Sequence, residues 1–367
     1  MDFLFKENSL HDLLVKVNAG QRLTRQDGIR LMQSNDLLTL GYMANMVREK
    51  INGDNAYFIV NRHINHTNIC VNLCPLCAFG VEADKPNAYL MDMEEIRRKS
   101  LEVKDSGVTE IHLVGGLHPD MPYQYYLDMI KTVRKCLPDV HIQAFTAVEI
   151  DYLCQLSEKS VSEVFDDLKE VGLGSMPGGG AEIFAKRVRE KICDKKISGE
   201  RWLNVMKAAH DAGLKSNATM LYGHVETYEE RIDHMIQLRE LQDQTGGFQS
   251  FIPLAFHPAH TRLEQPIKSR TTGFEDLKVL AVSRLMLDNF DHIKAFWIMV
   301  GAKLAQISLS FGVDDIDGTV VEEKITQAAG GEAGQALTKK ELVNMIKAAG
   351  RRPVERDTLY NVVRESF

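Results

Sequence analysis

The sequence predicts an α/β protein: a (β/α)8 barrel of the TIM type with an N-terminal helical cap and a C-terminal helical tail. Apolar segments of strand length alternate with amphipathic segments of helix length from about residue 57 onwards, an order that produces parallel βαβ units. Seven or eight such units fit within this chain of 367 residues, and a single barrel typically needs about 250 residues. An open, doubly wound parallel sheet is the alternative.

Residues 1–52 are predicted to form the helical cap. Leu10, Leu13 and Val17 recur at helical spacing, and Thr24 is suited to begin a second helix. We expect these helices to pack on the barrel and not to form a separate domain.

The barrel itself is predicted to span residues 53–335. The predicted strands are 57–67, 110–114, 140–145, 173–176, 215–222, 248–256, 292–299 and 313–316. The predicted helices include 93–105, 123–136, 201–212, 228–242, 274–289 and 303–311. Residues 336–367 are charged and are predicted to be a helical extension.

Composition excludes several classes of partner. The net charge of −7 provides no basic surface for nucleic acid. The longest apolar stretch, 295–313, contains Lys303, and the N-terminus mixes acidic residues with apolar ones, unlike a signal peptide. We therefore expect a cytoplasmic protein that binds neither membrane nor nucleic acid. The oligomeric state is left open.

Three cysteines form the strongest motif in the chain. Cys70, Cys74 and Cys77 have the spacing C-x3-C-x2-C and follow the first predicted strand. In a reducing compartment such a group indicates a metal site, because disulfides are rare there. Three thiolates can hold three irons of a [4Fe–4S] cube and leave the fourth iron open to a ligand. The alternatives are a zinc site completed by His66 and a cluster that only transfers electrons.

Other polar or glycine residues lie near predicted strand ends, where barrel enzymes build their active sites. Glu149, Asn217 and Thr219 are candidates to bind ribose hydroxyls, although Glu149 could cap a helix and Asn217 could be a satisfied interior amide. Three glycines (Gly178, Gly179, Gly180) precede a helix and could bind an anion, with a flexible loop as the alternative. His63 and Asn65 share one face of the first strand.

Further candidates follow later strands. Gly115 and Gly116 end the second strand and would let the backbone approach a ligand closely. The acidic run 314–319 is predicted to be a turn with a helix N-cap, and a magnesium site is the less supported alternative.

The cysteine spacing after the first strand resembles the signature of the radical S-adenosylmethionine superfamily. The resemblance implies that Cys70, Cys74 and Cys77 bind a [4Fe–4S] cluster that reduces S-adenosylmethionine to methionine and a 5′-deoxyadenosyl radical. Gly115 and Gly116 resemble the superfamily's Gly-Gly-Glu motif, with Leu117 in place of the glutamate, and Leu76 replaces its usual aromatic residue. The cofactor-binding residues expected on this basis are Gly115, Gly116, His118, Glu149, Asn217, Thr219, Gly223 and His224.

Longer segments resemble one subgroup, the barrel enzymes of the futalosine route to menaquinone and the related deazaflavin synthase. These segments are 66–72, 115–120, 311–315 and 317–319. Within the subgroup, the segments 175–184 and 294–299 resemble the aminofutalosine synthases.

The resemblance implies a transferase that adds the 5′-deoxyadenosyl radical to the vinyl carbon of 3-[(1-carboxyvinyl)oxy]benzoate. Aryl migration and loss of the carboxyl group as carbon dioxide or bicarbonate would then give 6-amino-6-deoxyfutalosine. An electron donor such as flavodoxin or ferredoxin is implied. The alternatives are a dehypoxanthine futalosine cyclase, a deazaflavin synthase subunit and, more remotely, a zinc-stabilised binding protein.

The substrate carries two carboxylates, which need cationic or N–H partners. His63, His257 and Arg262 are the candidates for contact with the reacting substrate. The expected substrate-binding residues are Asn65, Gly178, Gly179 and Gly180.

Overall fold

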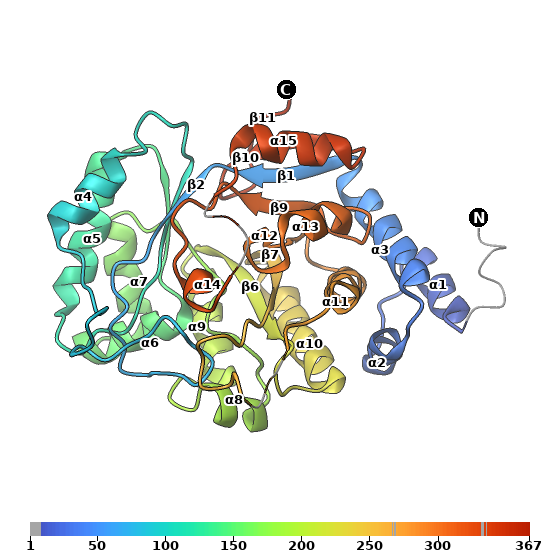
Figure 1. Cartoon of the computed structure of the whole chain (residues 1–367), viewed down its shortest axis with the longest axis horizontal. Coiled ribbons are helices and arrows are strands. Elements are labelled where there is room, and N and C mark those ends of the chain that lie inside the picture. The colour runs from blue at the N-terminus through green and yellow to red at the C-terminus, as the bar shows by residue number, and fades with distance from the viewer. Residues whose placement is uncertain (1–8, 266, 268, 332–333, 335) are drawn as a thin grey trace.

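The computed structural model describes residues 9–265, 267, 269–331, 334 and 336–367. Parallel strands alternate with helices that surround them (Figure 1). The strands are β1 (Asn55–Ile59), β2 (Asn61–Ile64), β3 (Glu110–Leu113), β4 (His141–Ala144), β5 (Ser175–Met176), β6 (Lys215–Tyr222), β7 (Phe248–Ala255), β8 (His292–Ile293), β9 (Asp315–Gly318), β10 (Arg352–Arg356) and β11 (Val362–Arg364).

Helices connect the strands and extend the chain at both ends. They are α1 (His11–Asn18), α2 (Arg25–Gln33), α3 (Leu37–Asn52), α4 (Met93–Leu101), α5 (Tyr123–Cys136), α6 (Ala147–Ser157), α7 (Val161–Glu170), α8 (Lys186–Ile192), α9 (Gly199–Asp211), α10 (Tyr228–Thr245), α11 (Gly273–Met286), α12 (Trp297–Val300), α13 (Ala302–Ser308), α14 (Ile325–Ala328) and α15 (Lys339–Ala348).

The strands form a barrel from two sheets, which are joined where β1 of one sheet continues into β2 of the other. β2 to β8 form one parallel sheet in sequence order, while β1 lies between β9 and β10 in the other. β1 and β2 are two halves of one strand that breaks at Val60. β9 also joins β8, because the N–H of Ala295 donates to the carbonyl of Asp315 at 2.8 Å. The predicted α/β barrel is therefore confirmed.

The N-terminal helices pack on the outside of the barrel, as expected, where α2 and α3 contact α10 and α11 (Figure 1). Thr24 and Asp27 form a capping box that begins α2. The contact is tight: a Cβ on Gly28 would lie 2.8 Å from the sulfur of Met286. The boundary at residue 52 stays a prediction.

Three sequence predictions are corrected by tertiary pairing. The strand predicted at 292–299 ends at Ile293, and α12 follows it, with the indole N–H of Trp297 donating to Gly318 at 2.8 Å. The run 314–319, predicted as a turn and helix cap, contains the buried strand β9. The tail at 336–367, predicted as helical, contains α15 and then β10 and β11. β10 is a strand because it pairs with β1, a partner almost 300 residues away that local sequence does not reveal.

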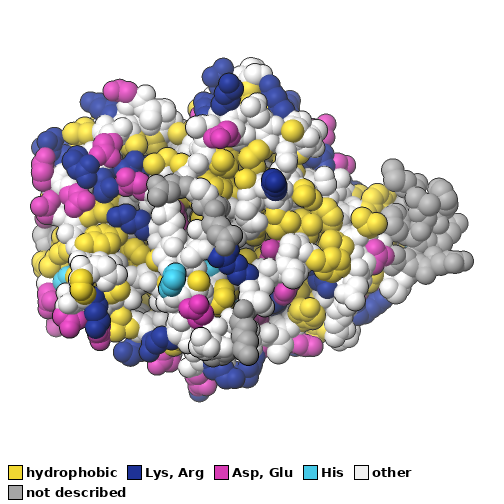
Figure 2. Space-filling view, in the orientation of Figure 1, with side chains coloured by type: hydrophobic (Ala, Val, Ile, Leu, Met, Phe, Trp, Pro, Cys, Tyr) yellow, Lys and Arg dark blue, Asp and Glu magenta, His cyan; other side chains and the backbone are white. Residues whose placement is uncertain are grey.

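The outer surface carries both signs of charge. Figure 2 shows Lys and Arg side chains interspersed with Asp and Glu on the face that it presents. No helix in the described ranges is long and apolar enough to cross a bilayer.

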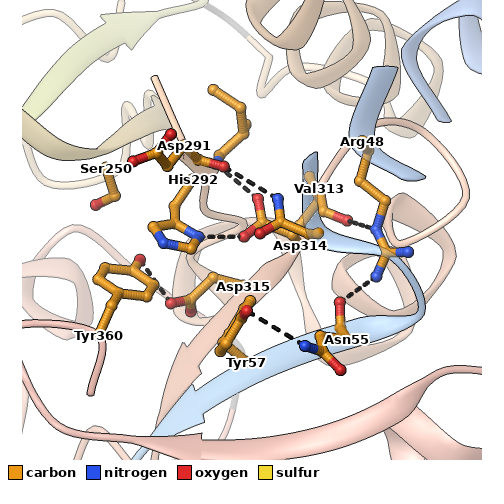
Figure 3. Close-up of polar contacts among 12 residues, drawn as sticks. Arg48, Asn55, Tyr57, Ser250, Asp291, His292, Val313, Asp314, Asp315 and Tyr360 are labelled. Atoms are coloured by element: carbon orange, nitrogen blue, oxygen red, sulfur yellow. Dashed lines mark hydrogen bonds and ion pairs between the residues drawn. The ribbon is translucent and has the colours of Figure 1, made fainter. Parts of the chain in front are cut away.

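Two consecutive aspartates fix β9 at the amino-terminal end of the barrel. Successive side chains of a strand point to opposite faces. Asp314 therefore points outward, where it accepts a hydrogen bond from Nδ1 of His292 at 2.6 Å (Figure 3). It also accepts hydrogen bonds from Arg284 and from the N–H of Ile293 at 2.8 Å. Burial alone would raise the pKa of Asp314, but His292 and Arg284 hold it below its usual range.

Asp315 points inward and is bound by the C-terminal tail. Its Oδ2 accepts from Nε of Arg356 at 2.7 Å and from the hydroxyl of Tyr360 at 2.8 Å. The ring of Tyr360 stacks on His292, with centroids 3.6 Å apart (Figure 3). The tail thus closes this end of the barrel.

Replacing Arg356 with Met should destabilise the protein by about 3–5 kcal/mol, because Asp315 would stay buried without its cation. Chemical unfolding gives the free energy. The exposed Arg352 on the same strand is the matched control, and Arg352→Met should cost less than about 1 kcal/mol. Equal effects of the two substitutions would contradict the assigned role of Arg356.

Asp314→Asn should destabilise the protein by an amount that depends on pH. The pKa of Asp314 is lower in the folded chain than its ordinary value of 3.8, so ionised Asp314 stabilises the fold fully above that value. This stabilisation is lost as the pH falls through the folded-state pKa. The difference from wild type, measured by chemical unfolding, should be constant between about pH 5 and 8 and should shrink below about pH 4. A difference that grows in acid would show that ionised Asp314 does not stabilise the fold. As the control, Asp84→Asn at the surface should change the free energy of unfolding by less than about 0.5 kcal/mol.

Candidate active site

A cavity of about 330 Å³ lies inside the barrel. Its walls come from the strands and from the loops that follow them, at the end where barrel enzymes bind their substrates. The predicted residues among its lining are Cys70, Cys74, Cys77, His63, Gly115, Gly116, Glu149, Gly178, Gly179, Gly180, Asn217 and Thr219.

The cysteine loop, residues 70–77, is held by backbone hydrogen bonds from several parts of the chain. The N–H of Cys70 donates to Val81 at 3.1 Å, and the N–H of Leu76 donates to Ile192 at 3.2 Å. On its outer side, Arg262 uses its N–H to bind Pro75 at 3.0 Å and its guanidinium to bind the carbonyl of Leu73. These bonds place the three thiols in one wall of the cavity before any ligand arrives.

The thiols lie in a buried environment beside a cation. Burial raises the pKa of Cys74 to about 12, and the ammonium of Lys196 partly offsets this rise. The pKa of Cys77 is raised for the same reason, and a hydrogen bond from the N–H of Gly80, 3.3 Å from its sulfur, favours its thiolate. A nearby positive charge suits a metal centre whose thiolate ligands are anionic.

The donor set fits a cluster better than a single zinc ion. One zinc would need its ligands close together, because each Zn–S bond is only about 2.3 Å long. In the part of the chain that the structure describes, no three His, Cys, Asp or Glu side chains could hold one ion together. A cube takes each thiolate at a different iron. His66, the fourth ligand of the zinc alternative, is buried beside Tyr126 and Gly115.

Gly115 and Gly116 lie directly against the start of the cysteine loop. A Cβ on Gly116 would lie 2.2 Å from the carbonyl oxygen of Ile69, and one on Gly115 would lie 2.5 Å from the ring of His66. The N–H of Gly116 donates to Thr67 at 2.9 Å. Only glycine permits this approach, which joins the end of β3 to the cysteine loop.

Glu149 fixes the orientation of the glycine segment. One carboxylate oxygen accepts the N–H of Gly115 at 3.0 Å, and the other accepts the N–H of Thr146 at 2.7 Å in the capping box that begins α6. Burial raises its pKa. Helix capping thus accounts for Glu149, and its contact with a ribose stays a prediction.

The triple-glycine loop packs against β6 and α9. The hydroxyl of Thr219 donates to Gly178 at 2.6 Å, and the indole of Trp202 donates to Gly179 at 3.1 Å. Asn217 donates to Gln143 at 3.4 Å. The loop is therefore an ordered wall of the cavity, and its binding of an anion stays a prediction.

Six predicted residues lie outside the cavity lining: Asn65, His118, Gly223, His224, His257 and Arg262. Asn65 joins β3 to the segment after β9, because its amide donates to Val114 and accepts from Lys324, both at 3.1 Å. Nε2 of His257 lies 2.9 Å from the carbonyl of Met299. These contacts support the loops around the cavity.

Three of the other outlying residues, His118, Gly223 and His224, lie in the loops that follow β3 and β6. Nδ1 of His118 accepts the N–H of Asp120 at 3.1 Å. Nδ1 of His224 lies 2.7 Å from Glu226, which also accepts the N–H of Gly223 at 2.6 Å. His63, by contrast, faces the cavity and stacks on His112, with ring centroids 4.5 Å apart.

Sequence reasoning missed the polar floor of the cavity. Glu110, His112 and Lys294 line the cavity and were not among the predicted site residues, and neither were Lys196 and Glu182, an ion pair in the wall near the cysteines. Asp317 also lines the cavity, and it belongs to the acidic run 314–319 that the sequence singled out as a turn. The alternation of Glu110, His112 and Val114 along one strand could have indicated an inward face. No local signal points to Lys294, because the sequence placed it in the middle of a longer strand.

Comparison with known proteins agrees with the barrel and its cysteine loop, which together define a radical S-adenosylmethionine enzyme. The radical SAM superfamily model matches residues 64–238, and a second model, the CofH/MqnC C-terminal region, matches residues 245–366. The chain belongs to the radical SAM superfamily, as the cysteine motif predicted.

Curated relatives cover almost the whole chain. It is 49% identical to the aminodeoxyfutalosine synthase of Thermus thermophilus over 95% of this chain and 94% of the relative. It is 44% identical to the aminodeoxyfutalosine synthase of Streptomyces coelicolor (96% and 94%). It is also 40% identical to the 5-amino-6-(D-ribitylamino)uracil–L-tyrosine 4-hydroxyphenyl transferase of Methanopyrus kandleri (88% and 88%).

Solved structures share the fold at low sequence identity. Methylornithine synthase superposes with a TM-score of 0.72 at 20% identity, covering 93% of this chain and 97% of that one. A maturase of the [FeFe]-hydrogenase superposes with a TM-score of 0.73 at 18% identity, covering 96% and 77%.

Gly116→Ala should reduce cluster uptake, because the new methyl group would push the carbonyl of Ile69 and shift the cysteine loop. The strain should also cost about 1–3 kcal/mol of stability. Iron and sulfide per chain after anaerobic reconstitution measure the effect. Gly334→Ala, where a Cβ meets nothing within 4 Å, is the control and should load like wild type. Normal iron content in Gly116→Ala would rule out the proposed contact.

Proposed function

We propose that this chain is an aminodeoxyfutalosine synthase. The single observation that carries the proposal is its 49% identity to the Thermus thermophilus enzyme of that name along nearly the whole of both chains. In the proposed reaction, one electron breaks the bond between the sulfur and the 5′-carbon of S-adenosylmethionine, methionine leaves, and the 5′-carbon bonds to the vinyl carbon of 3-[(1-carboxyvinyl)oxy]benzoate. The aryl group then migrates from the ether oxygen to the adjacent carbon. The carboxyl group leaves as carbon dioxide or bicarbonate, the electron is given back, and 6-amino-6-deoxyfutalosine remains.

In this proposal, different residues of the cavity bind the cluster and S-adenosylmethionine. Cys70, Cys74 and Cys77 would hold a [4Fe–4S] cluster, which supplies the electron that cleaves S-adenosylmethionine. Gly115 and Gly116 would take the methionine portion on their backbone, with Glu149 holding the segment in place.

The apolar part of the cavity would exclude water from the radical. Val148, Ile252, Leu254 and Phe296 are among its lining residues. Apolar walls keep water and loose hydrogen atoms from a reactive carbon. Flavodoxin or ferredoxin would donate the electron, and the cytoplasm is the proposed location, as for a biosynthetic enzyme with reduced thiols.

A second candidate function rests on the other curated relatives. The 40% identity to the Methanopyrus kandleri transferase makes an L-tyrosine-dependent reaction the alternative. The name of that relative gives L-tyrosine and an aminouracil as its substrates, whereas an aminodeoxyfutalosine synthase requires 3-[(1-carboxyvinyl)oxy]benzoate.

Product analysis tests the proposal. The protein is purified without oxygen, its cluster is rebuilt, and reductant, S-adenosylmethionine and 3-[(1-carboxyvinyl)oxy]benzoate are added. Mass spectrometry should reveal a product that carries the adenosyl group joined to the benzoate fragment. The matched incubation replaces the benzoate with L-tyrosine and 5-amino-6-(D-ribitylamino)uracil. Transfer of the tyrosine 4-hydroxyphenyl group to the aminouracil, with no adenosyl–benzoate product in the first incubation, would favour the transferase. Free 5′-deoxyadenosine with no coupled product in either incubation would contradict both candidates.

A further inference from the structure

Lys294 is a buried cation whose donors face the cavity. It follows β8 directly, only 6% of its surface is exposed, and it lines the cavity wall. Its nearest carboxylate oxygen, on Asp317, is 3.9 Å away, and its Nζ makes no hydrogen bond to any described residue. An ammonium has three donors, and those of Lys294 are open to the cavity. An anion in the cavity would satisfy them.

Contacts at the amino-terminal end of the barrel fix the position of Asp317, the neighbour of Lys294. The N–H of Asp317 donates to Oδ1 of Asp315 at 2.6 Å, and Asp317 has a φ of +65°. Such a conformation persists only where the surroundings hold it, and here Arg356 and Tyr360 hold Asp315. The pair is therefore preorganised, which is what a recognition site needs.

The other cations near the cavity already have partners. Lys196, which also lines it, makes an ion pair of 2.5 Å with Glu182. The guanidinium of Arg262 binds the carbonyl of Leu73 on the outer side of the cysteine loop. Among the described lysines and arginines that line the cavity, Lys294 is thus the one whose ammonium has unpaired donors to offer.

We propose that Lys294 binds the aryl carboxylate of the substrate, an inference that rests on the proposed synthase function. The reacting vinyl carbon must lie beside the adenosyl group, close to the cysteine loop at the carboxyl ends of the strands. The backbone of Lys294 lies level with Asp315, the first residue of β9, and therefore nearer the amino-terminal end of the barrel than the cysteine loop, so we expect the distal end of the substrate to reach it. That end is the benzoate carboxylate, which the product retains.

The environment of the other carboxylate is consistent with its loss. Ile252, Leu254 and Phe296 form an apolar wall above the floor. A carboxylate without a cationic partner is destabilised in apolar surroundings. Its departure as neutral carbon dioxide, which gives back the one electron spent on cleaving S-adenosylmethionine, removes this cost. At the floor, burial raises the pKa of Asp317, and the ammonium of Lys294 opposes that rise.

Binding measurements on the cluster-loaded enzyme test this inference. Calorimetry without reductant compares 3-[(1-carboxyvinyl)oxy]benzoate with its analogue in which the benzoate carboxylate is a carboxamide. Lys294→Met should weaken binding of the acid by roughly 10- to 100-fold and change binding of the amide little. Lys294→Arg should recover part of the affinity for the acid and serves if the Met variant does not fold.

Lys278→Met is the matched control, since Lys278 is equally buried but lies on α11 outside the cavity, where it donates to Met32 at 3.1 Å. It should leave both affinities unchanged.

Unchanged affinity for the acid in Lys294→Met, or an equal loss for acid and amide, overturns the inference. If binding of the acid depends on Lys294 but the product assay yields no adenosyl adduct, the anion site is supported and the synthase reaction is rejected. Failure of the wild type to bind either compound rejects both.

Discussion

The fold depends on how β9 closes the barrel. Two adjacent aspartates do this, because a strand sends successive side chains to opposite faces. Asp314 binds Arg284 and His292 on the outside, and Asp315 binds the C-terminal tail on the inside. Without Arg284, His292 and Arg356, the two buried carboxylates would lack a cationic partner, and an unpaired buried charge is strongly destabilising. The tail is therefore part of the barrel and not an appendage.

The same closure connects the bottom of the barrel to its chemistry. Asp315 accepts hydrogen bonds from the tail and also from the backbone of Asp317, which faces the cavity. At the opposite end, the cysteine loop is bound by backbone groups from four other segments. The cavity thus lies between two regions that are rigid before a ligand binds, and preorganisation of this kind lowers the cost of holding a reactive intermediate.

The distribution of polarity inside the cavity matches the proposed substrate. Its thiols and glycine backbone lie along one wall, apolar side chains from β7 and the segment after β8 form another, and charged groups form the floor. A substrate with a charged aryl end and a reacting vinyl end suits that order.

The sequence by itself determined the alternation of strands and helices, the cysteine loop and the superfamily, because local periodicity and a twelve-residue motif carry those features. It also placed the glycines at 115–116, 178–180 and 223 at the ends of strands, where the structure has them. Only the tertiary structure decided that Glu149 caps a helix, that Arg262 supports the cysteine loop, and that the tail forms strands. It alone brought Lys294 beside Asp317. These contacts join residues far apart in the chain, and no local pattern encodes which distant strand a charged segment will pair with.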